Sequence, residues 1–404
     1  MRKGVFFSFI MVFLTVTITT LVAIQNSLIS SRREEIFIES RINSMNNLYE
    51  SIVRDIQKSL EIIAIRAMAV AFMNVSASGQ VLPNANESLK QLILYGTLDG
   101  SPMSLMENAT FLEWISKIKE VSELKGFSTD INVNSMTIKP YDSFNLEIET
   151  NISINITDEQ GVASLNKFTI IDSLVDIENL EDPLYPLKTE GLGNNIIKKS
   201  PYEGNYTQLV LTGNGGNSYV YGETTTDTVN FDDKILVVND VNSIIGLNDA
   251  KGVISQVTNT TPITIPYLIN SSALSLISSG INVLLDGNEE KVWYIDNLII
   301  HTENSYYQSS VNGPSYLDRV EEKLQVQSKY SSQTTNTIGL ESFIDKNELG
   351  LKGVPIVIER TNADYLYFTG GTLGSCVKSL DSTFRIDNDH KDIYNVTDLT
   401  YSCS

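Results

Sequence analysis

The sequence predicts an α+β fold that follows an N-terminal transmembrane helix. Three observations support this: a long apolar run near the start, a helical spacing of apolar residues behind it, and a later change to strict alternation. The chain has 404 residues, of which 42% are hydrophobic, so it can bury a core across two or three domains. In order, we expect a membrane anchor at 1–30, an amphipathic stalk helix at 31–80, an α+β head at 81–180, a linker at 181–204, a β-rich module at 205–300 and a β-rich C-terminal region at 301–404.

The first segment is an apolar run between two basic pairs. Met1–Arg33 contains four basic residues and no acidic one, and the only polar members of Val5–Ile24 are Ser and Thr. Twenty residues at helical rise span about 30 Å, the thickness of the bilayer hydrocarbon. A cleavable secretory signal is the alternative, but its small-residue site is poor because Leu21 lies two positions before Ala23. We therefore expect an uncleaved or N-terminally trimmed membrane helix.

The stalk is predicted from a spacing of three to four residues between apolar positions. Neither Pro nor Gly occurs from Val5 to Ala77, so the membrane helix can continue until Gly79 and Pro83 end it. A helix with one apolar stripe needs a partner surface in water. That surface is either the protein's own sheet or the same helix of a neighbouring copy. The stripe comprises Ile38, Ile42, Met45, Tyr49, Ile52, Ile56, Leu60 and Ile63.

The head combines two short helices with an antiparallel meander. The helices are expected at Glu87–Leu94 and Phe111–Leu124, with Gly126 as the cap that ends the second. The period then changes to two, and a turn is expected at Asp158–Gly161 before a strand at Phe168–Ile171. The alternating apolar residues that predict the earlier strands are Phe144, Leu146, Ile148, Ile152, Ile154 and Ile156.

Charge and residue usage limit the function classes. A formal net charge of −20 argues against a nucleic-acid partner, and two His and two Cys leave little for a zinc site or a Cys/His catalytic system. We also expect no cofactor. The two cysteines, Cys376 and Cys403, suit a disulfide in an oxidising compartment, although two unpaired thiols are the alternative. Closing that loop would stabilise the fold by about 3.5 kcal/mol. We therefore expect a single-pass cell-membrane protein with the bulk of its chain outside the cell.

The extreme N-terminus resembles the class III signal of archaeal type IV pilin-like proteins. Arg2-Lys3-Gly4 is followed directly by the apolar Val5-Phe6-Phe7. The resemblance implies cleavage between Gly4 and Val5, which would leave the apolar helix at the new N-terminus. It also implies a helix-then-meander head and assembly through the N-terminal helix. Bacterial-type pilins carry Glu five residues into the mature chain, whereas this sequence has Phe9.

A second resemblance covers residues 234–296, whose small-residue and strand pattern is similar to the swivelling β/β/α fold of protease-associated domains. The phosphohistidine enzymes that share this fold need a His between two of the strands, and Gln256–Ile265 contains none. The resemblance therefore implies a scaffold or ligand-presenting module. In front of it, strands at 208–211 and 218–221 flank Gly213–Asn217, which we interpret as a hairpin turn because no P-loop Lys follows.

The C-terminal region is expected to contain one helix at Pro314–Leu324 and strands at Val354–Ile358 and Tyr365–Phe368. Gln325–Asn336 is polar and predicts an exposed loop. The acidic run Asp387–Asp392, which contains His390, lacks the Gly and distal Glu of a calcium loop. We interpret it as a solvated loop, with a weak surface cation site as the alternative.

No pair of carboxylates and no Ser in a nucleophile-elbow motif stands out, so we expect no enzymatic activity. The function favoured is a structural or adhesive surface protein with the bilayer, copies of itself and other envelope components as partners. A ligand- or glycan-binding receptor is the alternative, followed by a membrane-anchored hydrolase. Nine Asn-x-Ser/Thr sequons suit an exported, glycosylated surface; they begin at Asn74, Asn86, Asn108, Asn151, Asn155, Asn205, Asn259, Asn270 and Asn395.

Overall fold

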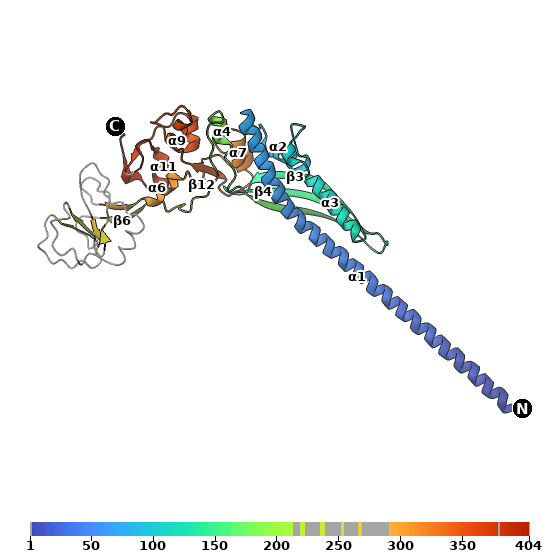
Figure 1. Cartoon of the computed structure of the whole chain (residues 1–404). Helices are drawn as coiled ribbons and strands as arrows, with labels where there is room; N and C mark the ends of the chain where they lie inside the picture. The colour runs from blue at the N-terminus through green and yellow to red at the C-terminus, as the bar shows by residue number, and fades with distance from the viewer. Residues whose placement is uncertain are drawn as a thin grey trace. The chain divides into compact units, whose positions relative to one another are not determined.

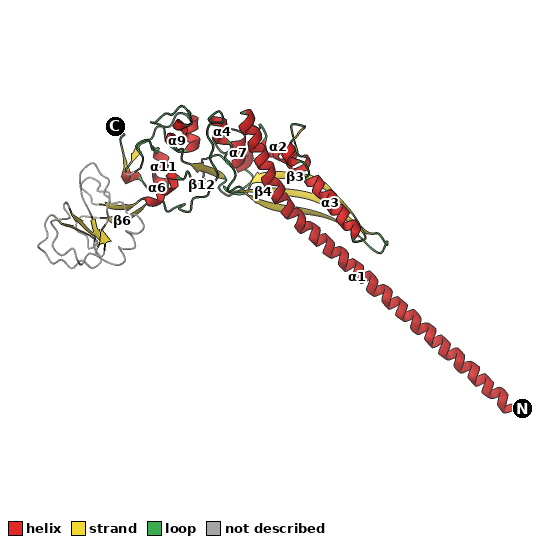
Figure 2. Cartoon of the chain, viewed as in Figure 1, coloured by secondary structure: helices red, strands yellow, loops and turns green. Residues whose placement is uncertain are grey.

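A computed structural model shows a mixed helix-and-strand protein, in agreement with the predicted α+β class (Figures 1 and 2). The chain divides into two compact units. The first comprises Met1–Ala67, Leu89–Ile138 and Glu147–Val175, and the second comprises Met68–Ser88, Lys139–Leu146 and Asp176–Ser404. The residues described are 2–212, 219–222, 235–238, 252–253, 266–268, 291–378 and 380–403.

Helix α1 (Arg2–Ser78) is a single unbroken helix, drawn in blue in Figure 1. It confirms that the membrane run and the stalk form one element, since no Pro or Gly interrupts them. Gly79 ends the helix with a φ of +65°, and its N–H donates to the Val75 carbonyl at 2.9 Å. The left-handed conformation at this position favours glycine.

The rear part of α1, from Met45 onward, buries members of the predicted apolar stripe within the first unit. Met45, Tyr49, Ile52 and Ile56 are buried, whereas Ile38 is 42% exposed and Ile42 is 37% exposed, so packing starts only at Met45. The helix meets strand β5 (Ser164–Asp176), where the Gln57 side chain donates to the Asp172 carbonyl at 3.2 Å. The partner surface of this part of α1 is therefore the protein's own sheet.

Two further helices, α2 (Ala85–Tyr95) and α3 (Phe111–Leu124), confirm the predicted pair. Thr110 and Glu113 form a capping box at the start of α3, which satisfies two backbone donors there. Gly126 has a φ of +76°, as expected of a residue that ends a helix. Short elements connect the two helices, namely β1 (Thr97–Leu98), β2 (Ser101–Pro102) and the 3-10 turn η1 (Ser104–Met106).

The meander is present as a three-stranded sheet in the order β3-β4-β5, with β3 at Phe127–Pro140 and β4 at Asn145–Asp158. The two alternating runs expected at 144–148 and 152–156 are one strand, because buried Thr150 keeps the alternation in register between them. The predicted turn follows β4, where Gly161 N–H donates to the Asp158 carbonyl at 2.8 Å. Burial alternates from one residue to the next along β4, which explains why the sequence pattern predicts this strand.

The segment 181–204 differs from the linker expected. It contains helix α4 (Leu184–Lys188), and Asp182 and Ile197 are completely buried. Pro183 precedes this helix, and Pro186 lies in its first turn. Backbone N–H groups have no helical partner in a first turn, so these prolines start a helix rather than mark an exposed connection.

Among the described residues between 205 and 300, the structure shows six short strands. The predicted hairpin is wrong, because β6 (Gln208–Thr212) pairs with β11 (Lys291–Tyr294), while β7 (Tyr219–Gly222) pairs in parallel with β8 (Ile235–Val238). Strand β10 (Pro266–Leu268) pairs with both β8 and β9 (Gly252–Val253), so that the sheet has the order β7-β8-β10-β9. Gly213–Asn217 and most of 234–296 lie outside the described residues.

The C-terminal region contains more helix than expected. Tyr365–Phe368 lies in helix α10 (Asp364–Thr369) instead of a strand, and Val354–Ile358 is irregular. The helix expected at Pro314–Leu324 is the shorter α7 (Tyr316–Val320), which Ser315 caps. The other elements are α6 (Asp296–Glu303), β12 (Tyr307–Ser310), α8 (Ser328–Ser331), β13 (Gly339–Ser342), α9 (Lys346–Leu351), β14 (Cys376–Val377), α11 (Asn388–Ile393), η4 (Thr397–Leu399) and β15 (Thr400–Tyr401).

Helix α8 falls inside the run 325–336 that was expected to be an exposed loop, and its Tyr330 is buried. The Tyr330 hydroxyl donates to Glu321 at 2.8 Å, so the ring can be buried with its polar group satisfied. The core of the C-terminal region is a cluster of apolar side chains drawn from several short elements. It includes Tyr206, Ile295, Leu298, Phe343, Phe384, Ile386, Tyr394 and Leu399.

Candidate membrane anchor and polar sites

The front part of α1, from Phe7 to Ile29, exposes its apolar side chains. Phe7, Phe9 and Phe13 are 73%, 72% and 68% exposed, and Leu21 is 61% exposed. The most apolar 18-residue window of this helix has a mean hydropathy of 2.3 and no buried residue. Among the described residues, α1 is the one helix that is long and apolar enough to cross a membrane, a property that a signal sequence shares.

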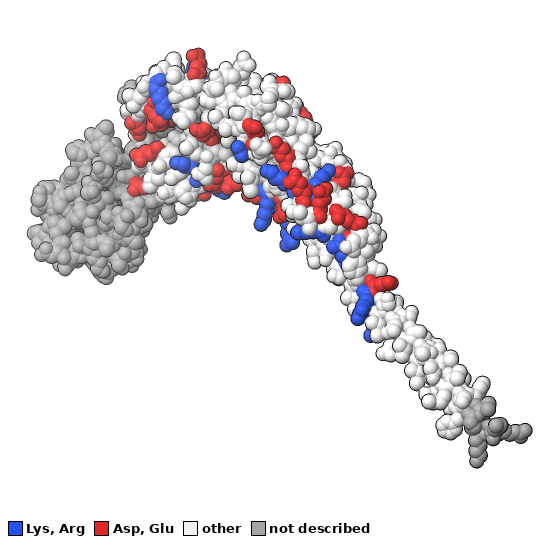
Figure 3. Space-filling view, turned by 45° about the vertical axis from the view of Figure 1, so that its right-hand side comes forward, with Lys and Arg blue, Asp and Glu red and all other residues white. Residues whose placement is uncertain are grey.

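The polar residues of this run are compatible with a bilayer. Thr15 donates its hydroxyl to the Met11 carbonyl at 2.8 Å, and Thr17 donates to Phe13 at 2.8 Å. Such bonds satisfy the hydroxyl without water. On the face drawn in Figure 3, the described N-terminal part of α1 carries no Lys, Arg, Asp or Glu side chain until blue and red side chains begin nearer the first unit. In the sequence, the first charges after the apolar run are Arg32, Arg33, Glu34 and Glu35.

Gly4 and Val5, the positions of the expected cleavage, lie in the first turns of α1. A cut between them would leave a helix that starts directly with its apolar run.

Cys376 and Cys403 are joined by a disulfide, with their Cα atoms 5.3 Å apart. The bond lies beside the pairing of β14 with β15, in which Cys376 faces Tyr401. It closes a loop of 27 residues at the C-terminal end of the chain.

The nine sequons differ in accessibility. Asn108, Asn155, Asn205 and Asn395 are exposed. Asn74, Asn86 and Asn151 are half-buried, and Asn259 and Asn270 lie outside the described residues. The exposed four are therefore the ones whose side chains are open to modification.

The acidic run with His390 is not the solvated loop expected. Residues Asn388–Ile393 form α11, and Asp387 caps it by accepting from the backbone N–H of His390 at 3.2 Å. The His390 ring is 1% exposed and lies between Asp387 Oδ1, at 2.8 Å from Nδ1, and Glu341 Oε2, at 3.1 Å from Nε2. Burial disfavours the imidazolium, but the two carboxylates outweigh it and raise the pKa of His390 to about 10.

This arrangement is an ion triad that stays charged at neutral pH. Despite its burial, Asp387 has its pKa lowered to about 2 by His390. Glu341 on β13 also accepts from the Tyr394 hydroxyl at 3.2 Å and from the Gln308 amide. His390 is buried and both of its ring nitrogens are bound to carboxylates, so the triad acts as a structural element.

A second buried cluster, missed from the sequence, surrounds Arg319. Its Nη1 donates to Asp182 at 2.5 Å and to Asp364 at 2.8 Å, and its Nη2 donates to the Leu340 carbonyl at 2.6 Å. Arg319, Asp182 and Asp364 are all fully buried. Burial raises the pKa of Asp364 to about 6 against the opposing effect of Arg319. These partners are 137 and 45 residues from Arg319, so no local pattern could have revealed them.

His301 lies in helix α6 and is completely buried. Its Nδ1 is 3.0 Å from Ser200 Oγ, while its Nε2 has no hydrogen-bond partner among the described residues. The ring packs against Tyr206 and Phe343. Burial lowers its pKa to about 3, so it is a neutral core residue.

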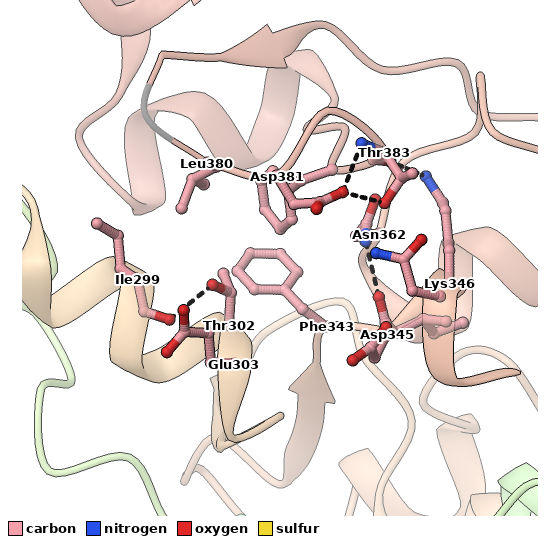
Figure 4. A pocket seen from close by; sticks show the side chains of 13 residues that line it. Ile299, Thr302, Glu303, Phe343, Asp345, Lys346, Asn362, Leu380, Asp381 and Thr383 are labelled. Atoms are coloured by element: carbon pink, nitrogen blue, oxygen red, sulfur yellow. Dashed lines mark hydrogen bonds between the residues drawn. The ribbon is translucent and has the colours of Figure 1, made fainter. Parts of the chain in front are cut away.

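A cavity of about 220 Å³ opens between α6, the segment after β13 and the loop 380–384 (Figure 4). Phe343 and Leu380 form its apolar side, and Glu303, Asp345 and Asp381 contribute carboxylates. Asp381 already accepts from Thr383 N–H at 2.7 Å.

Lys346 also lines this cavity, but its amine is already bound. Nζ donates to the carbonyls of Ile358, Arg360 and Thr383 at 3.0, 2.6 and 3.0 Å. Burial and the nearby Arg385 lower the pKa of Lys346 to about 7. Three carbonyl acceptors require the three donors of the ammonium form, so the amine is not presented as a nucleophile.

Among the residues that the structure describes, no group of three His, Cys, Asp or Glu side chains could hold a metal ion. No family model matches the chain, and no curated protein or solved structure matches it.

Proposed function

We propose that this chain is a non-enzymatic cell-surface protein, anchored in the membrane by α1, which assembles with copies of itself in a pilin-like manner. The observation that carries the proposal is the division of α1. Its front part exposes an apolar surface over its whole circumference, while its rear part packs on the protein's own sheet. The exposed run from Phe7 to Ile29 is about 35 Å long at helical rise, slightly more than the bilayer hydrocarbon.

Two features support placing the bulk of the chain outside the cell. The C-terminal disulfide suits an oxidising compartment. Four exposed sequon asparagines would be accessible to glycosylation there. Other envelope components are then the natural neighbours of the C-terminal region.

The test is intact mass and N-terminal sequencing of the protein purified from its native membrane. A mature chain that starts at Val5 is the expected result, because peptidase removal of residues 1–4 leaves the apolar helix intact. A chain that starts at Met1, or one cut near Ala23, would contradict the pilin-like proposal. Electron microscopy of the cell surface then distinguishes filaments from a solitary anchor.

A further inference from the structure

A groove runs along the first unit between α1 and α3. It has a volume of about 400 Å³, and we call it the α1–α3 groove. Ile62, 69% exposed, and Val121, 50% exposed, leave apolar surface open along it. Its lining residues are Leu48, Ser51, Ile52, Asp55, Lys58, Ser59 and Ile62 from α1, and Trp114, Lys117, Ile118, Val121, Ser122 and Lys125 from α3.

The lining of this groove is basic, whereas the chain as a whole is acidic. Lys58, Lys117 and Lys125 line it, against one carboxylate, Asp55. The three acidic residues of α3, Glu113, Glu120 and Glu123, are not among its lining residues. The lining of the groove thus combines apolar side chains with three lysines and one carboxylate, which is complementary to an apolar helix face flanked by carboxylates.

The same chain presents such a helix surface at residues 35–42 of α1, which we call the stalk patch. Glu35, Ile38, Glu39 and Ile42 follow the i, i+3, i+4, i+7 spacing and therefore share one face. All four are exposed. Ile38 and Ile42 are the front end of the stripe whose later members pack on the sheet, and their own sheet leaves them uncovered.

A chain cannot fill its own groove with its own stalk patch. Both belong to the single helix α1, and 17 residues separate Ile38 from Asp55, which is about 25 Å at helical rise. Arg41 further fixes this part of the helix, because it donates to the Gly126 carbonyl at 2.8 Å and pairs with Asp158. The occupant must come from another molecule.

We propose that the stalk patch of one copy docks in the α1–α3 groove of a second copy. The proposal rests on the self-assembly proposed above and names its contact surfaces. Two different surfaces meet, so the contact is head-to-tail and can repeat without closing. Parallel copies joined this way are displaced by about 25 Å along the helix axis. Because the bilayer hydrocarbon is about 30 Å thick, a displacement of this size draws most of one copy's apolar run out of the membrane, as addition to a growing fibre requires.

The test uses the full chain displayed on cells, with single cysteines introduced for a short bismaleimide cross-linker. The native cysteines are already joined in a disulfide, so introduced thiols are the reactive ones. Ile38→Cys combined with Val121→Cys is expected to give a ladder of covalent oligomers. Two matched controls place a thiol on another face of the same helix: Phe37→Cys with Val121→Cys, and Ile38→Cys with Glu123→Cys. Both are expected to give at least about fivefold less product.

A charge reversal supplies the second measurement. Lys117→Glu with Lys125→Glu is expected to weaken oligomer formation about tenfold, and adding Glu35→Lys with Glu39→Lys is expected to restore it. Covalent dimers formed from Ile38→Cys alone in equal yield would show symmetric helix pairing and overturn the proposal. Filaments without the Ile38–Val121 cross-link would overturn the groove contact while leaving assembly intact. No self-association of any kind would overturn both proposals.

Discussion

The meander of the first unit and the C-terminal region of the second unit are stabilised in different ways. Strand β4 buries an alternating row of side chains, and Ile152, Ile154 and Ile156 are fully buried. The C-terminal region adds buried ions to its apolar core, because Arg319 and His390 each lie between two carboxylates. Apolar burial is tolerant of small errors, whereas a buried ion without its partner is costly. The two regions should therefore respond differently to substitution and to pH.

The largest effect is expected from Arg319→Met, which leaves Asp182 and Asp364 buried without their cation. We expect a loss of about 4 kcal/mol in the free energy of unfolding. Hydrogen exchange should show lost protection in peptides from 295–403 and little change in those from 147–175. The matched control adds Asp182→Asn and Asp364→Asn, which should recover most of the loss. A loss below about 1 kcal/mol in the single variant would contradict the role assigned to Arg319.

The next effect is a pH dependence due to His390. Its folded pKa, about 10, lies above its unfolded value, so its stabilisation is fully present below about pH 6.5 and is lost as the pH rises to about 10. Lys346 acts oppositely in the same range, because its pKa is lowered. The comparison is therefore between wild type and His390→Gln by urea unfolding from pH 6 to 9.5. The stability difference should shrink as the pH rises; a constant difference would show that His390 is neutral in the folded protein.

In the meander, Ile154→Ala should cost about 3 kcal/mol, because it opens a cavity in an apolar layer. Its neighbour Asn155 is exposed, so Asn155→Ala should change stability by less than about 0.5 kcal/mol. Denaturant unfolding at pH 6 and at pH 9 checks both. The cost of Ile154→Ala should be the same at the two pH values, because the cost of a cavity left by an apolar side chain does not depend on protonation. A clear pH dependence would remove the contrast with the C-terminal region.

The smallest effect is expected at the start of α3, where Thr110 accepts from Glu113 N–H at 3.2 Å. Thr110→Ala should cost about 1 kcal/mol, because a capping bond is lost. Ser116→Ala, at an exposed position of the same helix, serves as the control and should be nearly neutral. Equal unfolding midpoints for the two variants would show that the capping box adds nothing.

Local patterns predicted the elements whose burial repeats along the chain. Helix α3 shows this, since its boundaries follow from its caps, and so does the alternation of β4, although the sequence divided that strand into two runs. The same reasoning was wrong for Tyr365–Phe368, because four apolar residues are too few to separate a strand from a helix turn. It was also wrong for Asp387–Asp392, because the burial of His390 depends on Glu341, 49 residues away.

The two candidate sites also differ in how far the sequence predicts them. The candidate membrane helix is predictable from the sequence, because length and apolar composition are sufficient to recognise such a run. The α1–α3 groove is not, because it depends on which members of two amphipathic helices remain uncovered after packing. Val121 of α3, for example, is apolar and yet 50% exposed in the structure.

The absence of Pro and Gly along α1 between Val5 and Ala77 also has a mechanical consequence. A continuous helix resists bending along its whole length, so in the proposed anchor no joint would separate the bilayer from the residues that are buried from Met45 onward. The first unit would then lean only as far as the helix tilts, typically about 20° from the bilayer normal. A force on this unit would be transmitted along the helix axis to the proposed membrane segment.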